Sequence, residues 1–318
     1  MSNMLKIKEI ETQYGTTQKI VLYCNKIEEK ETKSKDSKKY LLFHLTDGEN
    51  DIDAKRWNYS MEDFKNASVP VKIPGVVIMK LEVQEYNGQP SFIVQGFTTS
   101  DRYPAALFAK KAPIDAEQTF QTILSDARQY REPYASLVCC LYEENHEKLL
   151  QWGAAKHIHH NMAGGLLYHV SRMHAMAKKI ASLYDCDSDL LMAGVDLHDI
   201  GKLNELLTDD LGTSDFTIEG SLKGHIVLGV QMLNDCVREH EFDRTVDILK
   251  LEHMILSHHG KPEWGSPVSP AFLEAAILHH LDMIDSQGEQ FERAMKDAQP
   301  GVSRPFSGAL KNNILFKG

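Results

Sequence analysis

Hydrophobic and polar positions alternate in short runs along the first third of the chain. This alternation predicts β-strands that bury one face. Between the runs, Asp47-Gly48 and Asn87-Gly88 are typical of tight turns. The polar stretch 28–39 predicts a long exposed loop. The runs themselves occupy residues 20–23, 40–46, 51–57, 76–83 and 91–94. Short strands at this density predict a small barrel.

Beyond Tyr103-Pro104 the apolar residues recur every three or four positions, which predicts helices. A polar segment at 206–219 interrupts them and predicts a loop. The helices are expected near 115–131, 135–152, 165–184, 188–199, 223–239, 244–259 and 269–295. The fold class is therefore multidomain, with an N-terminal small β-barrel followed by an all-α helical bundle. For the barrel an OB-fold is the first candidate, and another small barrel or sandwich is the alternative.

Composition is that of a globular protein, with 42% hydrophobic and 25% charged residues among 318. Residues 1–6 open no signal-peptide apolar core, and no apolar run reaches the roughly 20 residues of a membrane span. The five cysteines contain no CxxC pair. They predict reduced thiols and a cytoplasmic protein that does not contact membranes.

Charge and histidine are unevenly distributed. Residues 1–110 sum to +1, whereas the remainder of the chain carries −11. This acidic part does not suit a broad phosphate-binding surface, but it does suit a site that gathers cations. Of the 15 histidines, 14 lie between His146 and His280. The clustering points to metal chemistry in the helical part.

A set of histidines and aspartates falls on separate predicted helices. One helix ends in His198-Asp199, and Gly201 allows the chain to turn away from that pair. The other candidate ligands are His169, His225, His258, His259 and Asp282. Imidazole and carboxylate ligands suit Mn²⁺, Fe²⁺, Co²⁺ and Zn²⁺. A divalent-metal site is therefore predicted, with Mn²⁺ first among these ions.

The order of these residues, H … HD … H … HH … D, resembles that of the HD superfamily of phosphohydrolases. The segment HHNMAGGLLYH, residues 159–169, is similar to the opening motif of the YhaM-type 3′→5′ exoribonucleases. LTDG at 45–48 and DIDAKRW at 51–57 look like the OB signature of the same family. The resemblance covers nearly the whole chain. It implies an OB-fold nucleic-acid-binding domain at 1–103, a helical linker or extension at 104–155 and an HD domain at 156–318.

The resemblance also implies roles for individual residues. His169, His198, Asp199 and Asp282 would hold one metal ion, and Asp199 would bridge to a second ion held by His225 and His258, with His259 beside it. A water activated by the two ions would attack the terminal phosphodiester. Lys202 would neutralise a phosphate oxygen. His160 is expected from its own position, just before the helix that carries His169, to touch the substrate phosphate. Asp199, Lys202 and His160 are thus the expected catalytic residues.

The barrel carries the candidate nucleic-acid contacts. The lysines between Lys26 and Lys39 alternate with acidic residues, which is typical of a solvated loop. On an OB-fold that loop flanks the binding face, so a role in guiding a strand is predicted. Aromatic side chains would supply stacking platforms. The candidate binding residues are Lys38, Lys39, Tyr40, Phe43, Lys55 and Trp57.

Three functions compete at this point. The first is a metal-dependent 3′→5′ exonuclease that hydrolyses single-stranded RNA, or single-stranded DNA, to nucleoside 5′-monophosphates. The second is an HD phosphodiesterase acting on small nucleotides or cyclic dinucleotides. The third is a nucleic-acid-binding protein with a structural metal, which the excess of ligands over the four of a closed site disfavours. Assembly into a homo-oligomer stays open.

Overall fold

The computed structural model describes residues 4–32, 38–66, 72–154, 162–209, 211–296, 298, 300–303, 310 and 314–317. The chain divides into two compact units, Met1–Lys110 and Lys111–Gly318. Each unit has its own hydrophobic core. The predicted boundary between 155 and 156 lies outside the described residues, so the finer three-part division stays a prediction.

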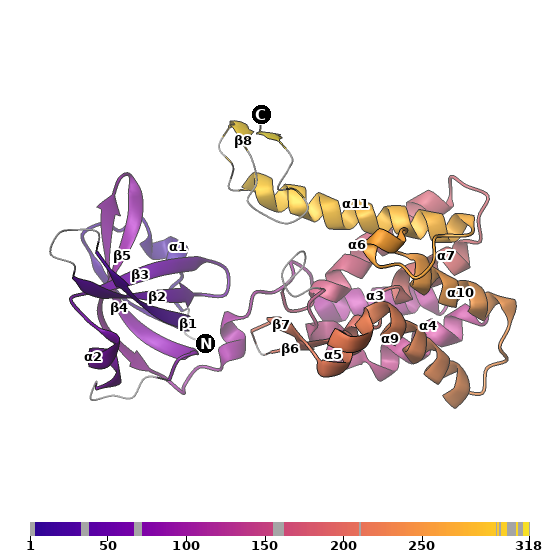
Figure 1. The fold of residues 1–318 in the computed structure, drawn as a ribbon, viewed down its shortest axis with the longest axis horizontal. Coiled ribbons are helices and arrows are strands. Elements are labelled where there is room, and N and C mark those ends of the chain that lie inside the picture. The colour runs from indigo at the N-terminus through magenta and orange to yellow at the C-terminus, as the bar shows by residue number, and fades with distance from the viewer. Residues whose placement is uncertain are drawn as a thin grey trace. The chain divides into compact units, whose positions relative to one another are not determined.

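The first unit is a closed barrel with the strand order β1-β2-β3-β5-β4 (Figure 1). All pairs are antiparallel except β3 with β5, and β1 closes the barrel by pairing with β4. The strands are β1 (Thr17–Glu31), β2 (Lys39–Thr46), β3 (Asp51–Trp57), β4 (Gly75–Tyr86) and β5 (Gln89–Thr99). This confirms the predicted small β-barrel and gives it an OB-like topology.

Alternation along β2 and β3 decides which side chains fill the barrel. Leu41, Phe43 and Leu45 are buried in the core. Tyr40 lies on the face of β2 opposite to these three residues, and it pairs in register with Trp57 of β3. Successive side chains point to opposite faces of a strand, so Tyr40 and Trp57 share the outer surface. The core also takes residues from α1 (Ile7–Ile10), and α2 (Met61–Lys65) follows β3.

The predicted loop at 28–39 is partly wrong. Strand β1 continues to Glu31, and Glu28 to Glu31 pair with residues 39–42 of β2. Cross-strand ion pairing accompanies this extension, because Lys39 Nζ lies 2.9 Å from Glu29 Oε1. The charges that indicated a loop are therefore those of an exposed strand pair.

The second unit is helical, as predicted, with one continuous core. Its α-helices pack together in one bundle (Figure 1). They are α3 (Ala116–Ala127), α4 (Tyr134–Glu144), α5 (His146–Gln151), α6 (Gly165–Ala181), α7 (Ser188–Leu197), α8 (Lys202–Glu205), α9 (Ile218–Glu239), α10 (Val246–Ser257) and α11 (Leu273–Lys296). Short elements of this unit are η2 (Pro262–Trp264) and the pair β8 (Gly301–Ser303) and β9 (Leu315–Lys317), whereas η1 (Ala105–Phe108) belongs to the first unit.

Side-chain caps fix where several of these helices begin. Asp187 accepts a hydrogen bond from the Leu190 amide at the start of α7. Thr245 caps α10 through the Ile248 amide. The polar segment 206–219 is not a plain loop, since β6 (Leu206–Thr208) and β7 (Ser214–Phe216) form a short hairpin there. Three-residue strands lie below the length that alternation can reveal.

Among the described residues, no helix combines the length and the apolar character that crossing a bilayer requires.

Candidate metal centre

Five helices bring the predicted metal ligands to one place in the helical unit. Each ligand lies at a helix end, beside a kink or on a helix face that points into the core. His169 lies on α6, His198 and Asp199 end α7, His225 follows a kink in α9, His258 and His259 end α10, and Asp282 lies on α11.

Two glycines allow α9 to approach the end of α7. A Cβ added at Gly201 would lie 2.0 Å from the carbonyl oxygen of His225, so only glycine permits this contact. Gly224 has a φ of 73° and breaks the helical path of α9. The amide of His225, released by the kink, donates to Glu205 Oε1 at 2.9 Å. The close approach of α9 to Gly201 and the kink at Gly224 together place His225 beside Asp199.

Asp199 lies between two groups of imidazoles and is only 2% exposed. Its Oδ2 is 3.4 Å from His198 Nε2 and 3.7 Å from His169 Nε2. The other oxygen, Oδ1, is 3.6 Å from His225 Nε2 and 3.7 Å from His258 Nε2. The two oxygens of one carboxylate thus face different histidines.

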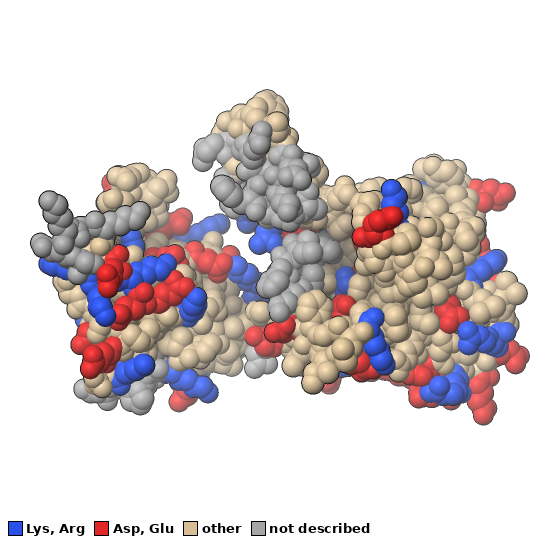
Figure 2. Space-filling view, viewed as in Figure 1, with Lys and Arg blue, Asp and Glu red and all other residues tan. Residues whose placement is uncertain are grey.

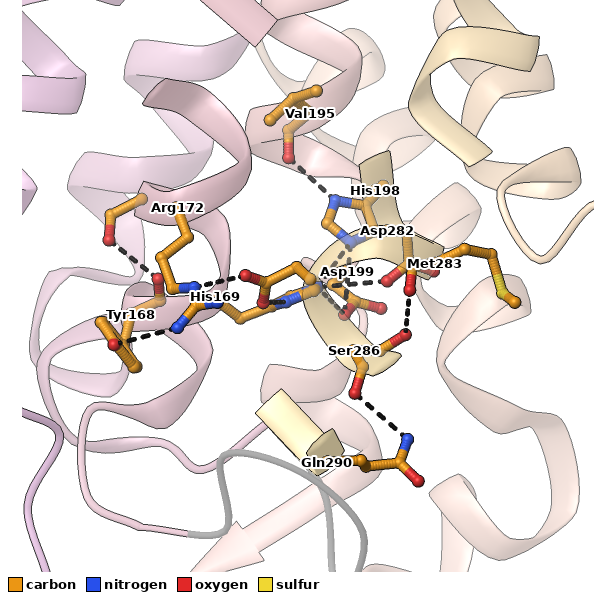
Figure 3. A network of polar contacts seen from close by, with 12 residues as sticks. Tyr168, His169, Arg172, Val195, His198, Asp199, Asp282, Met283, Ser286 and Gln290 are labelled. Carbon is orange, nitrogen blue, oxygen red and sulfur yellow. Dashed lines mark hydrogen bonds and ion pairs between the residues drawn. The ribbon is translucent and has the colours of Figure 1, made fainter. Parts of the chain in front are cut away.

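The first group is completed by α11. Asp282 Oδ1 lies 3.4 Å from His169 Nε2, and Figure 3 shows His169, His198, Asp199 and Asp282 converging. The ligand atoms of His169, His198 and Asp199 lie within 4.8 Å of one another. The same limit holds for the second group, which consists of His225, His258 and His259.

All five imidazoles are held by their Nδ1 atoms. Each Nδ1–H donates to a protein oxygen, which leaves the Nε2 lone pair available to an ion. The acceptors are Asp285 Oδ2 for His169 (2.7 Å), Val195 O for His198 (2.8 Å), Glu205 Oε1 for His225 (3.1 Å), Ile255 O for His258 (2.7 Å) and Trp264 O for His259 (2.9 Å).

Unsatisfied polar atoms at this place fit a bound cation. In the part of the chain that the structure describes, Asp199 Oδ1, His225 Nε2 and His258 Nε2 are buried without a hydrogen-bond partner. Such atoms cost free energy unless something pairs with them. One divalent cation would satisfy all three, and nitrogen and oxygen donors suit a first-row metal.

Protonation states agree with this chemistry. Burial alone would raise the pKa of Asp199, but the charges of Lys202 and His198 hold it well below its usual value. Burial likewise opposes ionisation of Asp282, but a hydrogen bond from His169 holds that pKa far below the ordinary range. Burial and the nearby charge of His198 lower the pKa of His258 well below its usual value. Ionised carboxylates and neutral imidazoles are the metal-binding forms.

His169 behaves differently from His258. Burial by itself lowers its pKa, but Asp282 and Asp285 outweigh burial and raise the pKa to about 9. In the metal-free protein a proton on His169 Nε2 lies between this nitrogen and Asp282 Oδ1. A bound cation would take the place of that proton. Metal binding at His169 therefore releases a proton.

Lys202 and a pocket lie next to Asp199. Lys202 Nζ donates to Asp199 Oδ2 at 2.6 Å, and although burial disfavours its charge, Asp199 raises the Lys202 pKa. The pocket has a volume of about 190 Å³. It is lined by Asp199, Lys202, His259, Trp264, Asp282, Met283 and Ser286. The predicted ligands thus open onto a space that a small part of a substrate can enter.

Three functional residues escaped the sequence analysis. Asp285 and Glu205 orient His169 and His225, and the Trp264 ring lines the pocket. For Asp285 a signal was available, because it lies three residues after Asp282 and so on the same helix face. For Glu205 there was none, since its contact with His225 depends on the kink at Gly224. His160 lies outside the described residues.

The predicted nucleic-acid contacts on the barrel fall into two classes. Trp57 is 42% exposed, its ring centroid lies 4.8 Å from that of Tyr40, and Lys55 Nζ lies 5.6 Å above its ring. Lys38 and Lys39 are exposed as well. Phe43, in contrast, is completely buried, which corrects the prediction that its ring stacks on bases.

No single-sign patch dominates the visible face of the barrel unit. Figure 2 shows Lys and Arg interspersed with Asp and Glu there. Several of these charges are paired, as in Lys26 and Lys30 with Glu28. The Tyr40–Trp57 pair on the outer surface, rather than net charge, is the feature of the barrel that suits a nucleic acid.

Comparisons with known proteins cover both units. The family model of the HD domain matches residues 166–287. The 3′-5′ exoribonuclease YhaM of Bacillus subtilis is 34% identical over 286 residues, and its namesake in Oceanobacillus iheyensis is 32% identical over 285 residues. Both alignments cover 88% of this chain and 88% of the relative. An OB domain from Thermoplasma acidophilum, solved by NMR, matches 32% of this chain and 92% of its own length, at 16% identity and a TM-score of 0.25. The extent and identity of the two exoribonuclease alignments confirm the resemblance, and the chain belongs to the YhaM family of 3′-5′ exoribonucleases.

Proposed function

We propose that this chain is a divalent-metal-dependent exoribonuclease that removes nucleoside 5′-monophosphates from the 3′ end of single-stranded RNA. The observation that carries the proposal is the position of Asp199 between two imidazole groups, one facing each carboxylate oxygen. A carboxylate in this position suits the bridging ligand of a two-metal phosphodiesterase. The names of the relatives supply the substrate class and the direction.

Two ions are proposed, with Mn²⁺ first and Fe²⁺, Co²⁺ and Zn²⁺ as alternatives. His169, His198 and Asp282 would hold one and His225, His258 and His259 the other, with Asp199 shared. When bound, the ions supply Lewis-acid chemistry to the phosphodiester and lower the pKa of the attacking water.

The protein's own groups prepare this chemistry. The oriented Nδ1 hydrogen bonds fix every imidazole before an ion arrives, so little reorganisation is required. Lys202 lines the pocket and stays charged, and we assign it to a non-bridging phosphate oxygen. His160 remains a proposed phosphate contact. We propose a cytoplasmic location because the five cysteines are free thiols, as is usual in that reducing compartment.

One assay tests the proposed activity. The protein is incubated with Mn²⁺ and a 5′-labelled single-stranded RNA, in parallel with a cyclic dinucleotide and a mononucleotide. A ladder that shortens from the 3′ end, with nucleoside 5′-monophosphate as the product, is the expected result. Hydrolysis of the small molecules alone would instead support an HD phosphodiesterase for nucleotides and would refute the exonuclease.

Trp264 is proposed as the platform on which the terminal base stacks. Its ring lines the pocket and is 48% exposed, while its backbone oxygen holds His259. Replacement of Trp264 with alanine should lower kcat/KM for RNA about 5- to 150-fold, since stacking contributes roughly 1–3 kcal/mol per base. Trp264→Phe, which keeps an aromatic face, should recover most of the loss. Equal kcat/KM for Trp264→Ala and the wild type would exclude the platform.

On the barrel, Tyr40 and Trp57 are proposed to bind RNA upstream of the site of cleavage. The double substitution Tyr40→Ala/Trp57→Ala should weaken binding of a single-stranded 15-mer at least fivefold, because two stacking surfaces are lost. Cleavage of a dinucleotide should be unchanged, since every candidate metal ligand belongs to the helical unit. Tyr14→Ala, another exposed tyrosine of the same unit, is the control. An unaltered 15-mer affinity in the double variant would remove the barrel face from the proposal.

A further inference from the structure

A second group of metal-ligating side chains lies away from the histidine–aspartate centre, between α4 and α9. Cys140 and Glu144 come from α4, Cys236 comes from α9, and His240 is the residue that ends α9. Ligand atoms of Cys140, Cys236 and His240 lie within 4.8 Å of one another. None of these residues has a part in the proposed nuclease chemistry.

The spacing explains why the four side chains meet. Cys140 and Glu144 are four residues apart, and so are Cys236 and His240. Residues at this spacing lie above one another on the same helix face. Packing of α4 against α9 then turns one pair toward the other, and both helices are anchored in the core through neighbours such as Leu141 and Leu233.

The contacts within the group link its four side chains in a row. Cys236 Sγ lies 3.1 Å from Cys140 Sγ, and Cys140 Sγ lies 3.3 Å from Glu144 Oε1. His240 Nε2 is 3.0 Å from the same Oε1. At 3.1 Å the sulfurs are well beyond the 2.05 Å of a disulfide bond. Two sulfurs bound to one tetrahedral Zn²⁺ lie roughly 3.8 Å apart, given Zn–S bonds of about 2.3 Å. Small rotations of the two cysteine side chains would convert the present arrangement into that of a zinc site.

We propose that Cys140, Glu144, Cys236 and His240 form a structural zinc site that clamps α4 to the C-terminal end of α9. Two thiolates, one imidazole and one carboxylate supply the four ligands of a closed tetrahedral site. Binding of Zn²⁺ releases the two thiol protons, so the loaded site carries two thiolates and one carboxylate on a dication.

Burial favours a structural role over a catalytic one. Cys236 is 2% exposed, whereas the His240 and Glu144 side chains are 46% and 47% exposed. The buried sulfur would thus bind the ion from the protein interior, while His240 and Glu144 would bind it from the solvent-exposed side, by which the ion enters. Because α9 also carries His225, the clamp would stiffen a helix that contributes to the nuclease centre without touching that centre.

Cobalt titration tests the proposal in the reduced, metal-stripped full-length protein. Thiolate-to-cobalt charge transfer in the near ultraviolet comes only from cysteine ligands, so the histidine–aspartate centre is silent in this band even when it binds cobalt. We expect the final intensity of the band to correspond to one thiolate-bound cobalt per chain, and Zn²⁺ to displace that cobalt. Cys140→Ser and Cys236→Ser should each abolish it, whereas Cys139→Ser, the adjacent cysteine outside the group, should keep it.

Thermal unfolding gives an independent readout. At a hundredfold excess over Kd of the α4–α9 site, Zn²⁺ should add about 5–10 °C to the Tm of the wild type beyond the gain from the histidine–aspartate centre, and His240→Ala should lose this added part. His240 is exposed, so this variant should fold normally and its Tm without zinc should match that of the wild type. A wild type without the thiolate band would overturn the proposal. So would a thiol count of three in place of five with no bound zinc, since that outcome means a disulfide.

Discussion

Replacement of Asp199 with asparagine is expected to lower kcat for RNA by about a thousandfold or more. The amide keeps the shape of the side chain but removes the charge that both imidazole groups face. Loss of a single electrostatic stabiliser already costs about 10²–10³ in kcat, and here the shared ligand of two ions is lost. The measurement is kcat at saturating Mn²⁺, together with direct binding of the oligonucleotide, which should change little.

Asp185→Asn is the matched control, because it removes the same charge from an exposed position in the same unit. It should leave kcat within a factor of two of the wild type. Turnover of Asp199→Asn at the wild-type level would show that Asp199 does not hold the ions. Loss of RNA binding along with kcat would indicate unfolding, which circular dichroism detects separately.

Replacement of Asp285 with alanine is expected to lower metal affinity about 10- to 100-fold, the usual effect of losing the partner of a ligating histidine. Asp285 is completely buried, and its two oxygens contact His169 Nδ1 and the Arg172 guanidinium. Its removal takes the hydrogen-bond acceptor from His169 Nδ1 and the buried carboxylate from Arg172, so stability should also fall by about 3–5 kcal/mol. Isothermal titration with Mn²⁺ and chemical denaturation measure the two effects.

Glu292→Ala serves as the control for Asp285, since Glu292 contacts the same Arg172 from the exposed side, at 3.4 Å. This variant should retain both Mn²⁺ affinity and stability within error. If Asp285→Ala bound Mn²⁺ as tightly as the wild type, the orientation of His169 by Asp285 would have no part in assembling the site.

Much of this architecture could be predicted from the sequence, for local reasons. The short apolar run at 40–46 and the alternation at 51–57, separated by the turn at Asp47-Gly48, place β2 and β3 within one residue of the expected bounds. The ligand set was recognisable because its histidines and aspartates fall on separate predicted helices, in an order that resembles that of the HD superfamily. The structure places all seven predicted ligands together.

What the sequence concealed depends on tertiary contacts. The kink at Gly224 and the contact of Gly201 with the His225 carbonyl have no periodic signature. Phe43 fits a stacking platform by residue type, and only the register of β2 shows that it points into the core. The α4–α9 cysteine group combines residues 96 positions apart, which only helix packing brings together.

The position of the ions tests the central claim most directly. Anomalous diffraction from crystals soaked in Mn²⁺ should show two peaks in the histidine–aspartate centre, one on each side of Asp199 and roughly 3.5–4 Å apart. One peak should contact His169 and His198, and the other His225 and His258. A single ion bound by one group alone, or ions bound away from Asp199, would contradict the two-metal account.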